Sequence, residues 1–396
     1  MADGKQKYLG KNDRPITMTS VKNILIVAGE PSGDLQASLL VESFSKIDSE
    51  IRFWGFGGEK MRNVGVETIV DVENLAVMGL FDVVAEIPRI RGYMRKLMKQ
   101  VKIRKPLGAI LVDYPGFNLK LAKELKKLDI PVGYYISPQF WAWASWRVKK
   151  VKKYVDRMVC ILPFEKEFYR KYGIDVDFVG HPFIDIVNPE ISENEFREKF
   201  RLNGDFAVFL PGSRKKEISR LLAPMLEICD IIGSKREIDI VIAATPQTAE
   251  YIENMTNKRH LKRRPKVISG LTYSAMSYAK AGIIASGSAT VEALILGLPA
   301  IVVYRVDSIS WAIGKMLIKV ENIALANLIA EERIYPEFIQ KFTPEILAEN
   351  LLKFLDDEKI RTEMKSKLSS AKSKLGEGGA PSKAAKIFKN LFMKNN

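Results

Sequence analysis

The stretch from residue 281 to residue 304 reads Ala-Gly-Ile-Ile-Ala-Ser-Gly-Ser-Ala-Thr-Val-Glu-Ala-Leu-Ile-Leu-Gly-Leu-Pro-Ala-Ile-Val-Val-Tyr. Its two apolar runs, Ala281–Ala285 and Ala300–Tyr304, have the length and composition of buried strands, and the region between them has the length of a short helix. Small residues from Ser286 to Thr290 join the first run to that helix, and Glu292 interrupts the apolar character, so the stretch does not resemble a membrane span. A strand, a tight turn, a helix and a second strand form a βαβ unit, which predicts a parallel sheet covered by helices.

The same alternation of short apolar runs with longer amphipathic stretches continues along the chain. The other predicted strands are Asn23–Ala28, Arg52–Gly57, Leu107–Val112, Val132–Ile136, Arg157–Ile161, Val176–Val179, Ala207–Leu210, Asp239–Ala243 and Lys266–Ser269. Two successive α/β sets, each opening with a strand that runs into a glycine-containing turn, predict two Rossmann-like, doubly wound domains. A chain of 396 residues is long enough for two such cores.

The join between the two domains is expected near residues 181–194, where Pro182 and Pro189 break the pattern. The predicted parts of the chain are a flexible extension (residues 1–20), a first domain (21–187), a second domain (188–375) and a basic C-terminal helix (376–396). We expect this last helix to pack back on the first domain.

Composition and charge limit the cellular compartment and the binding partners that we expect for this protein. The formal net charge of +15 indicates an anionic partner such as nucleic acid, an anionic membrane or a phosphorylated substrate, unless it merely reflects a lysine-coated surface. Cys160 and Cys229 are too few for a disulfide framework, which favours a reducing compartment. Residues 1–20 lack the apolar core of a signal peptide, and no apolar run is long enough to be predicted as a membrane span.

Two segments of the first domain combine basic and apolar residues. Residues 89–105 contain eight Lys or Arg and no acid, with apolar residues interspersed, namely Tyr93, Met94, Leu97, Met98 and Val101. This pattern is typical of a basic amphipathic helix at an anionic membrane surface, and equally of a solvated helix with ordinary core contacts. Residues 134–147 hold three of the five tryptophans, which indicates core packing or a platform for sugars or acyl chains, and a basic run follows at 147–153.

The turn after the strand Ala281–Ala285 is a candidate anion site. Gly287, Ser288, Ala289 and Thr290 are small enough to let a ligand approach the backbone, and the free amides at a helix start attract anions. A diphosphate suits such a place, and the carboxylate of Glu292 can then accept hydrogen bonds from the hydroxyls of a ribose. By itself the pattern equally fits a capped helix start in which Glu292 stabilises the helix dipole.

A second turn of this kind follows the strand Ala207–Leu210. Gly212 permits a tight turn, Ser213 can cap a helix, and Arg214 offers a cationic fork for phosphate, although an exposed basic helix start has the same appearance. In a doubly wound sheet both turns lie on the carboxyl edge of the strands. Their co-occurrence favours a nucleotide diphosphate site.

Carboxylates occupy the equivalent edge of the first domain. Glu30, Ser32 and Asp34 follow the strand Asn23–Ala28, and Asp113 ends the strand Leu107–Val112. Glu30 and Asp34 are therefore candidates for gripping sugar hydroxyls, with stabilisation of a helix start as the alternative. A carboxylate such as Asp113 can also take a proton from an attacking hydroxyl.

Other common sites are not supported by the residues. The chain has no Gly-x-x-x-x-Gly-Lys-Ser/Thr sequence, and Gly55–Gly58 lacks the third spaced glycine of the dinucleotide fingerprint. His181 and His260 are far apart and no Cys/His cluster exists, so no metal site is predicted. We interpret His181 first as a packed or hydrogen-bonded histidine at the domain join and second as a substrate contact.

An ordered set of blocks resembles one family, the lipid-A-disaccharide synthases. The blocks are Ala28–Asp34, Gly55–Gly58, Val77–Gly79, Asp113–Asn118, Ser137–Trp143, Leu162–Lys166, Val179–Pro182, Leu210–Arg214, Ser286–Glu292 and Asn327–Leu328. Each block alone is weak, but their consistent order from about residue 22 to past residue 340 is specific.

The resemblance implies an inverting, metal-independent glycosyltransferase without a cofactor, built from two facing Rossmann-like domains in the GT-B architecture. The implied donor is UDP-2,3-diacylglucosamine and the implied acceptor is 2,3-diacylglucosamine 1-phosphate. The implied products are a β-1,6-linked lipid A disaccharide 1-phosphate and UDP. The family also implies peripheral attachment to the cytoplasmic face of the inner membrane in a Gram-negative bacterium, which favours the membrane interpretation of residues 89–105.

The resemblance also assigns roles to residues. By position, the residues that hold UDP would be Arg214, Ser288, Ala289, Thr290 and Glu292, and Asn327 would lie near the nucleotide. Glu30, Asp34 and Asp113 would face the sugars. Some members carry Asp where this chain has Gly116, and that Asp is a favoured candidate for the catalytic base. In this chain the role of the base therefore falls to Asp113 or to a carboxylate of the first loop.

Two alternatives follow from the same residues. One is a UDP-sugar epimerase or another transferase of the same architecture, which would yield no such disaccharide. The other is a non-catalytic basic protein that binds nucleic acid or membrane. Carboxylates at several strand ends argue against nucleic acid, because they would repel phosphates. Acyl-chain preference and oligomeric state are not predicted.

Overall fold

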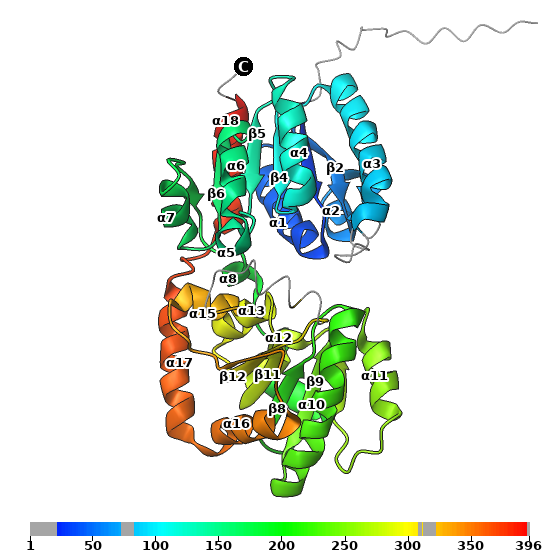
Figure 1. Cartoon of the computed structure of the whole chain (residues 1–396), viewed down its shortest axis with the longest axis vertical. Helices are drawn as coiled ribbons and strands as arrows, with labels where there is room; N and C mark the ends of the chain where they lie inside the picture. Colours follow the sequence, from blue (N-terminus) through cyan, green and yellow to red (C-terminus); the bar gives the residue numbers. More distant parts are fainter. Residues whose placement is uncertain (1–21, 73–82, 308–310, 312–321, 394–396) are drawn as a thin grey trace, which may run out of the picture.

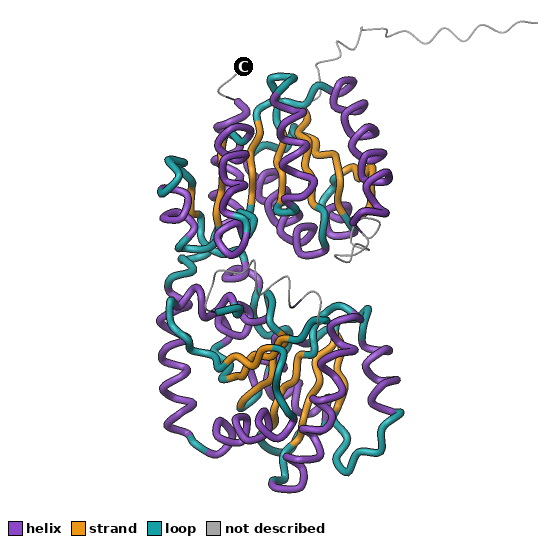
Figure 2. Tube along the Cα trace, in the orientation of Figure 1, coloured by secondary structure: helices purple, strands orange, loops and turns teal. Residues whose placement is uncertain are grey.

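The computed structural model describes residues 22–72, 83–307, 311 and 322–393. The predicted extension over residues 1–20 and the Val77–Gly79 block lie outside the described residues. Two α/β domains are stacked along the long axis of the molecule (Figure 1), and helices cover both faces of the strands (Figure 2). The predicted α/β class with two doubly wound domains is confirmed.

The first domain is built on a parallel sheet in the order β3-β2-β1-β4-β5-β6-β7. Its strands are β1 (Asn23–Ala28), β2 (Arg52–Gly57), β3 (Glu67–Asp71), β4 (Ala109–Val112), β5 (Val132–Tyr135), β6 (Arg157–Cys160) and β7 (Asp177–Phe178). Its helices are α1 (Pro31–Ile47), α2 (Glu59–Asn63), α3 (Val83–Arg104), α4 (Pro115–Lys126), α5 (Phe140–Trp143), the 3-10 turn η2 (Ser145–Arg147), α6 (Val148–Tyr154) and α7 (Glu165–Arg170).

Alternate residues of the central strand β1 serve two different cores. Ile24 and Ile26 belong to the core that α1 covers, whereas Leu25 and Val27 belong to the core that α3, α4 and α6 cover. Both sets are fully buried. A strand buried on both faces is almost continuously apolar, which is why β1 was readable from sequence.

The second domain has a parallel sheet in the order β10-β9-β8-β11-β12-β13. Its strands are β8 (Phe206–Leu210), β9 (Asp239–Ala244), β10 (Lys266–Ser269), β11 (Ala281–Ala285), β12 (Ala300–Tyr304) and β13 (Glu337–Ile339). Helices from the domain join onward are α8 (Phe183–Ile186), α9 (Glu193–Phe200), α10 (Lys215–Lys235), α11 (Ala249–Asn257), α12 (Thr272–Tyr278), α13 (Ala289–Leu296), α15 (Leu325–Ala330), α16 (Pro344–Asp356) and α17 (Glu358–Ser373).

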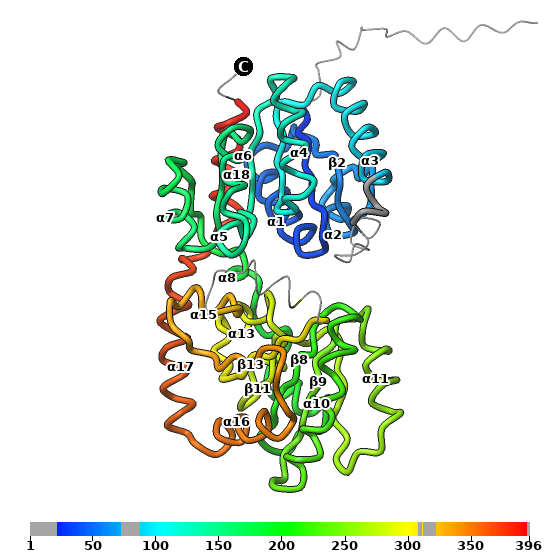
Figure 3. Tube along the Cα trace, in the orientation of Figure 1, coloured from blue at the N-terminus to red at the C-terminus, as the bar shows by residue number. Residues whose placement is uncertain are grey.

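The last helix, α18 (Ala380–Met393), returns to the first domain and packs against α1 (Figure 3). Its Phe388 ring lies so close to Gly133 that a Cβ there would be 2.5 Å from the ring, and it meets Tyr135 edge to face. The Lys389 ammonium donates to the Ile47 carbonyl at 3.0 Å. The chain therefore crosses between the domains twice.

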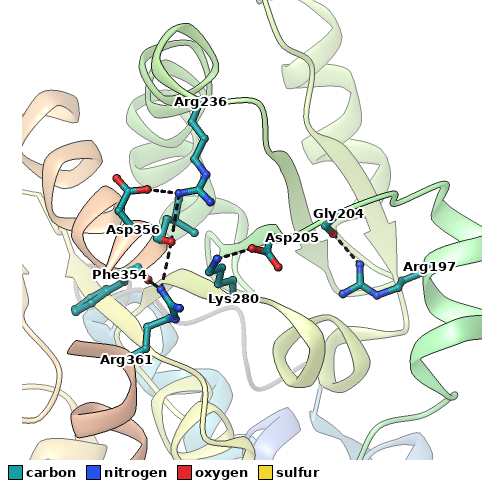
Figure 4. Close-up of polar contacts among 9 residues, drawn as sticks. Arg197, Gly204, Asp205, Arg236, Lys280, Phe354, Asp356 and Arg361 are labelled. Atoms are coloured by element: carbon teal, nitrogen blue, oxygen red, sulfur yellow. Dashed lines mark hydrogen bonds and ion pairs between the residues drawn. The ribbon is translucent and has the colours of Figure 1, made fainter. Parts of the chain in front are cut away.

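Charges at the amino end of the second sheet are satisfied within the domain (Figure 4). Lys280, just before β11, pairs with Asp205, just before β8, at 2.5 Å. Nearby, Arg236 pairs with Asp356, and Arg361 donates to the carbonyl of Phe354 at 2.8 Å. These charges are occupied by structural contacts, whereas ligands of open α/β sheets bind at the carboxyl ends of the strands.

The basic segment 89–105 forms most of α3. Leu97 and Val101 are buried in the core, and Tyr93, Met94 and Met98 pack against it. The apolar stripe of this helix is therefore used inside the domain, as the core-contact interpretation expected. Its cations Arg91, Arg95, Lys99 and Lys102 remain exposed. Among the described residues, no helix is long and apolar enough to cross a bilayer.

Candidate active site

The strand order of each sheet reverses at one point, and the predicted turns follow the strands at these points. In the first sheet the reversal lies between β1 and β4, which lead to Glu30 and Asp113. In the second sheet it lies between β8 and β11, which lead to Arg214 and Ser288. Ligands of open α/β sheets bind at the carboxyl ends of strands beside such a reversal.

The turn after β11 presents unpaired amides at the start of α13. The N–H groups of Gly287, Ser288 and Ala289 donate to no other described part of the chain. Thr290 closes the turn instead, because its hydroxyl donates to the Gly287 carbonyl at 2.8 Å. Thr290 is fully buried and its backbone N–H donates to the same carbonyl at 3.1 Å, so neither its hydroxyl nor its N–H is free for a ligand. This arrangement suits an anion at the helix start.

Glu292 lies in the first turn of α13 and accepts no hydrogen bond from the described residues. Burial raises the pKa of its carboxyl group to about 7. A carboxylate that is partly removed from water and lacks a partner is costly, and hydroxyl donors from a ligand would relieve that cost.

The turn after β8 depends on a glycine. Gly212 has φ of 109°, and a Cβ there would lie 2.0 Å from a carboxylate oxygen of Glu217. Glu217 uses that oxygen to accept the N–H of Ser213 at 3.3 Å. The backbone N–H of Ser213 is thus engaged. Arg214, the N-cap residue of α10, leaves the turn with a side chain that is 75% exposed.

One ion pair joins the two domains at these turns. The Arg214 guanidinium donates to the Glu30 carboxylate at 3.2 Å, across 184 residues of sequence. Both partners are well exposed, so the pair contributes little to stability and exchanges readily for another partner. The contact shows that the carboxyl edges of the two sheets meet.

Asp113 is held in an unusual backbone conformation. Asp113 and Tyr114 both have left-handed φ, 43° and 47°. The Asp113 N–H donates to the Tyr135 carbonyl at 3.1 Å, and its own carbonyl accepts from the buried Asn118 amide at 2.8 Å and from the Tyr134 hydroxyl. Such strain persists only where the surroundings enforce it, and it concentrates at functional sites.

The Asp113 carboxyl group is tuned toward neutral pH. Burial and, after it, the negative charge of Glu30 raise its pKa to about 7, against a hydrogen bond from the Tyr114 N–H that lowers it. A group with such a pKa is a competent base at neutral pH. Glu30 therefore contacts the second domain through Arg214, and its negative charge also raises the pKa of Asp113.

Asp34 binds three backbone amides of its own domain. One carboxylate oxygen accepts the N–H groups of Gly58 at 2.6 Å and Met61 at 3.2 Å, and the other accepts that of Lys60 at 3.1 Å. The residue is buried. Asp34 thus fixes the start of α2 against α1, which corresponds to the helix-stabilising alternative.

Asn327 is likewise committed to the structure. Its side-chain amide donates to Glu337 at 2.7 Å and to the Tyr335 carbonyl at 2.9 Å, and its oxygen accepts the Tyr335 N–H at 2.8 Å. Glu337 in turn accepts the N–H groups of Ile323 and Ala324. The Asn327 side chain is therefore engaged within the protein and not free to bind, and its position near a nucleotide stays a prediction.

We expect Asn327→Ala to destabilise the second domain by about 2–4 kcal/mol, because three buried groups lose their partners. Urea unfolding, with the midpoint compared at constant slope, measures this change. Asn350→Ala is the matched control, since Asn350 makes one exposed hydrogen bond, and we expect it to stay within about 0.5 kcal/mol. Equal effects of the two substitutions would contradict the structural role of Asn327.

His181 is a hydrogen-bonded histidine at the domain join. Its Nδ1 accepts the Phe183 N–H at 3.1 Å, and its backbone N–H donates to the Leu375 carbonyl at 2.8 Å. Burial lowers the pKa of the ring to about 3, so it is neutral at physiological pH. The first interpretation of this residue, a packed hinge histidine, agrees with these contacts.

Two doubly wound domains whose carboxyl edges meet define the GT-B class, which comprises nucleotide-sugar glycosyltransferases and related epimerases. The structure of UDP-GlcNAc 2-epimerase from Neisseria meningitidis bound to UDP-GlcNAc is similar, with a TM-score of 0.63 at 13% identity over 94% of this chain and 100% of that one. This is a likeness of fold.

Sequence comparison is more specific. The family model for lipid-A-disaccharide synthetase matches residues 24–390. Lipid-A-disaccharide synthases from Solibacter usitatus and Syntrophus aciditrophicus are 40% and 41% identical to this chain, covering 93% and 95% of it and 97% and 99% of their own lengths. The chain belongs to the lipid-A-disaccharide synthase family. It is a glycosyltransferase that performs the condensation reaction of lipid A biosynthesis.

Proposed function

We propose that the enzyme transfers 2,3-diacylglucosamine from its UDP derivative to 2,3-diacylglucosamine 1-phosphate, with inversion at the anomeric carbon. The observation that carries this proposal is the contact of Arg214 with Glu30, because it brings a candidate diphosphate site against a candidate sugar site. The family assignment supplies the substrate class.

The donor would bind to the second domain. Its diphosphate would accept hydrogen bonds from the free N–H groups of Ser288 and Ala289, where the dipole of α13 favours negative charge. Its ribose hydroxyls would donate to Glu292, whose carboxylate lies one turn along the helix and accepts no hydrogen bond from a described residue. Gly287 lies exposed before them and adds no side chain that would block the approach.

The acceptor would react at the edge of the first domain. Its primary hydroxyl attacks the anomeric carbon of the donor, the bond from that carbon to the UDP oxygen breaks, and Asp113 takes the hydroxyl proton. Arg214 exchanges its exposed partner Glu30 for the leaving diphosphate and stabilises the charge that develops there. Glu30, released from Arg214, becomes available to sugar hydroxyls.

The test is a reaction of purified protein with both diacyl sugars in mixed micelles. We expect equimolar disaccharide 1-phosphate and UDP, with a β-1,6 linkage in the NMR spectrum of the product. An epimerase would convert the donor sugar without forming a disaccharide. Folded protein that yields neither UDP nor disaccharide would refute the proposal.

We also propose that the protein attaches peripherally to the cytoplasmic face of the inner membrane, through charge alone. The apolar stripe of α3 is used in the core, which leaves Arg91, Arg95, Lys99 and Lys102 to face anionic lipid. Each such cation near the surface contributes about 1 kcal/mol. Co-sedimentation with phosphatidylglycerol vesicles should therefore be lost between about 0.05 and 0.5 M salt. Salt-resistant binding would contradict attachment by charge alone.

A further inference from the structure

A pocket of about 270 Å³ lies on the outer face of the first domain, between α4 and the η2–α6 segment. The residues that matter for its chemistry are Gly116, Lys120, Lys123, Arg147, Lys150 and Tyr154. Figure 1 shows α4 and α6 side by side, each beginning at the edge of the sheet that faces the second domain. The pocket is therefore a groove that starts near the proposed reacting groups.

The pocket concentrates positive charge without neutralising it. Four of its lining residues are cations, and none of its lining residues is an acid. None of these four cations forms an ion pair with a described residue. At the far end of the same helix, by contrast, Lys126 pairs with Asp156 at 2.7 Å and Lys127 with Glu124 at 2.8 Å. A concave site with several unpaired cations attracts an anion.

The side chain of Arg147 is held in place by aromatic rings. Its guanidinium lies 5.1 Å from the ring centres of both Trp143 and Trp146. The buried Glu165 holds the preceding turn, since one of its oxygens accepts the Trp141 indole N–H at 3.3 Å and the other accepts the Leu162 N–H at 3.1 Å. A stacked guanidinium keeps the N–H groups at its edge free, which is the geometry that binds phosphate in a bidentate manner.

The groove begins beside Asp113. Pro115 and Gly116, the first residues of α4, line it, and a Cβ on Gly116 would meet nothing within 4 Å, so its mouth is open. The Tyr134 hydroxyl donates to the Asp113 carbonyl. Burial raises the pKa of Tyr134, and the positive charge of Arg147 opposes this rise. From Gly116 to Lys120 the helix rises about 6 Å. This span is comparable to the reach from the primary hydroxyl of a hexosamine to the phosphate group on its anomeric carbon, which extend from the two carbons that flank the ring oxygen.

We propose that this groove binds the anomeric phosphate of the acceptor, with Arg147 and Lys120 as its principal ligands. The inference rests on the proposed function, and it assigns the acceptor an orientation. The primary hydroxyl lies at Asp113 and the phosphate lies one helical turn along α4. The enzyme then recognises its acceptor by the one group that an unphosphorylated diacyl sugar lacks.

The experiment compares two acceptors in neutral detergent micelles, 2,3-diacylglucosamine 1-phosphate and the same lipid without phosphate. For Arg147→Ala and for Lys120→Ala we expect the KM for the phosphorylated acceptor to rise about tenfold or more, as charge-assisted hydrogen bonds are lost. The KM for the donor should stay within about twofold of wild type. With the unphosphorylated acceptor the variants should match wild type. Arg147→Lys should recover part of the affinity.

Lys149→Ala is the matched control, because Lys149 is an exposed cation of α6, two residues after Arg147, but does not line the pocket. It should leave both acceptors unaffected. If Arg147→Ala and Lys120→Ala raise the KM for both acceptors equally, the groove is not a phosphate subsite and the inference is wrong. The same holds if they change only co-sedimentation with phosphatidylglycerol vesicles.

A binding measurement separates failure of this inference from failure of the proposed function. Trp143 and Trp146 adjoin the pocket through Arg147, so their fluorescence should respond to the phosphorylated lipid in neutral micelles. If wild type forms no disaccharide but shows this response, and Lys120→Ala loses it, the proposed reaction fails and the phosphate site stands. The same response to both lipids, or none to either, would overturn the phosphate site.

Discussion

Asp113→Asn is expected to lower kcat by about 1,000-fold, because an amide cannot take the proton from the attacking hydroxyl. The fold should persist. Asn tolerates the left-handed backbone that Asp113 adopts, and the hydrogen bonds that hold this position use the backbone of residue 113. Single-turnover rates of disaccharide formation measure the loss, and circular dichroism establishes that the variant is folded.

The raised pKa of Asp113 also leads us to expect a reaction rate that depends on pH. Its raised pKa of about 7 means that the carboxyl group is protonated below that pH and cannot act as a base. The rate of wild type should therefore fall as the pH falls through about 7, and Asp113→Asn should lack this dependence.

Glu292→Gln is the control for the pH profile, since burial raises the pKa of Glu292 to about 7 as well. We expect this variant to raise the KM for the donor by about tenfold through loss of a charged acceptor. In Glu292→Gln, kcat should still fall as the pH is lowered through about 7. A fall in kcat that survives in Asp113→Asn and vanishes in Glu292→Gln would transfer the essential ionisation to Glu292.

Arg214→Ala is expected to lower kcat by about 100-fold or more, the usual loss when a group that stabilises transition-state charge is removed. The side chain is 75% exposed and its ion pair with Glu30 is a surface pair, so the free energy of unfolding should change by less than about 1 kcal/mol. Initial rates of UDP release at saturating substrates, together with thermal unfolding, separate the two effects.

Lys216→Ala provides a matched change for Arg214→Ala, because Lys216 is an exposed cation in the first turn of the same helix and forms no ion pair with a described residue. It should retain wild-type kcat. Arg214→Lys should recover only part of the rate, since an ammonium lacks the planar fork that fits a phosphate. Wild-type turnover in Arg214→Ala would exclude Arg214 from the site.

Most of the fold could be predicted because a buried parallel strand is recognisable from its own run of apolar residues. Strands such as β1, β2 and β11 were predicted with the bounds that the structure shows. The sequence prediction omitted β3 and β13. They lie at sheet edges, where a strand needs fewer apolar residues, and Glu67–Asp71 and Glu337–Ile339 both begin with an acid. The second of them is also only three residues long.

The candidate site could be predicted only in part, because the sequence does not show which partner a polar side chain at a strand end contacts. Glu30 and Asp34 follow the same strand, yet Glu30 meets an arginine of the other domain and Asp34 meets three amides of α2. The groove at Arg147 was visible in sequence only as aromatic residues followed by a basic run. Its concavity arises from packing of α6 against α4.

The sequence by itself determined the two α/β domains, the turns that carry the site and, through ordered blocks, the family. These features depend on residues that are close in the chain, or on the order of such residues. The tertiary structure alone decided which polar groups are already satisfied and which remain free for a ligand. Glu30 and Arg214 are 184 residues apart, and only the meeting of the two sheet edges makes them partners. The stretch from residue 281 to residue 304 therefore gave half of the candidate site, and the folded chain placed the other candidate groups opposite it.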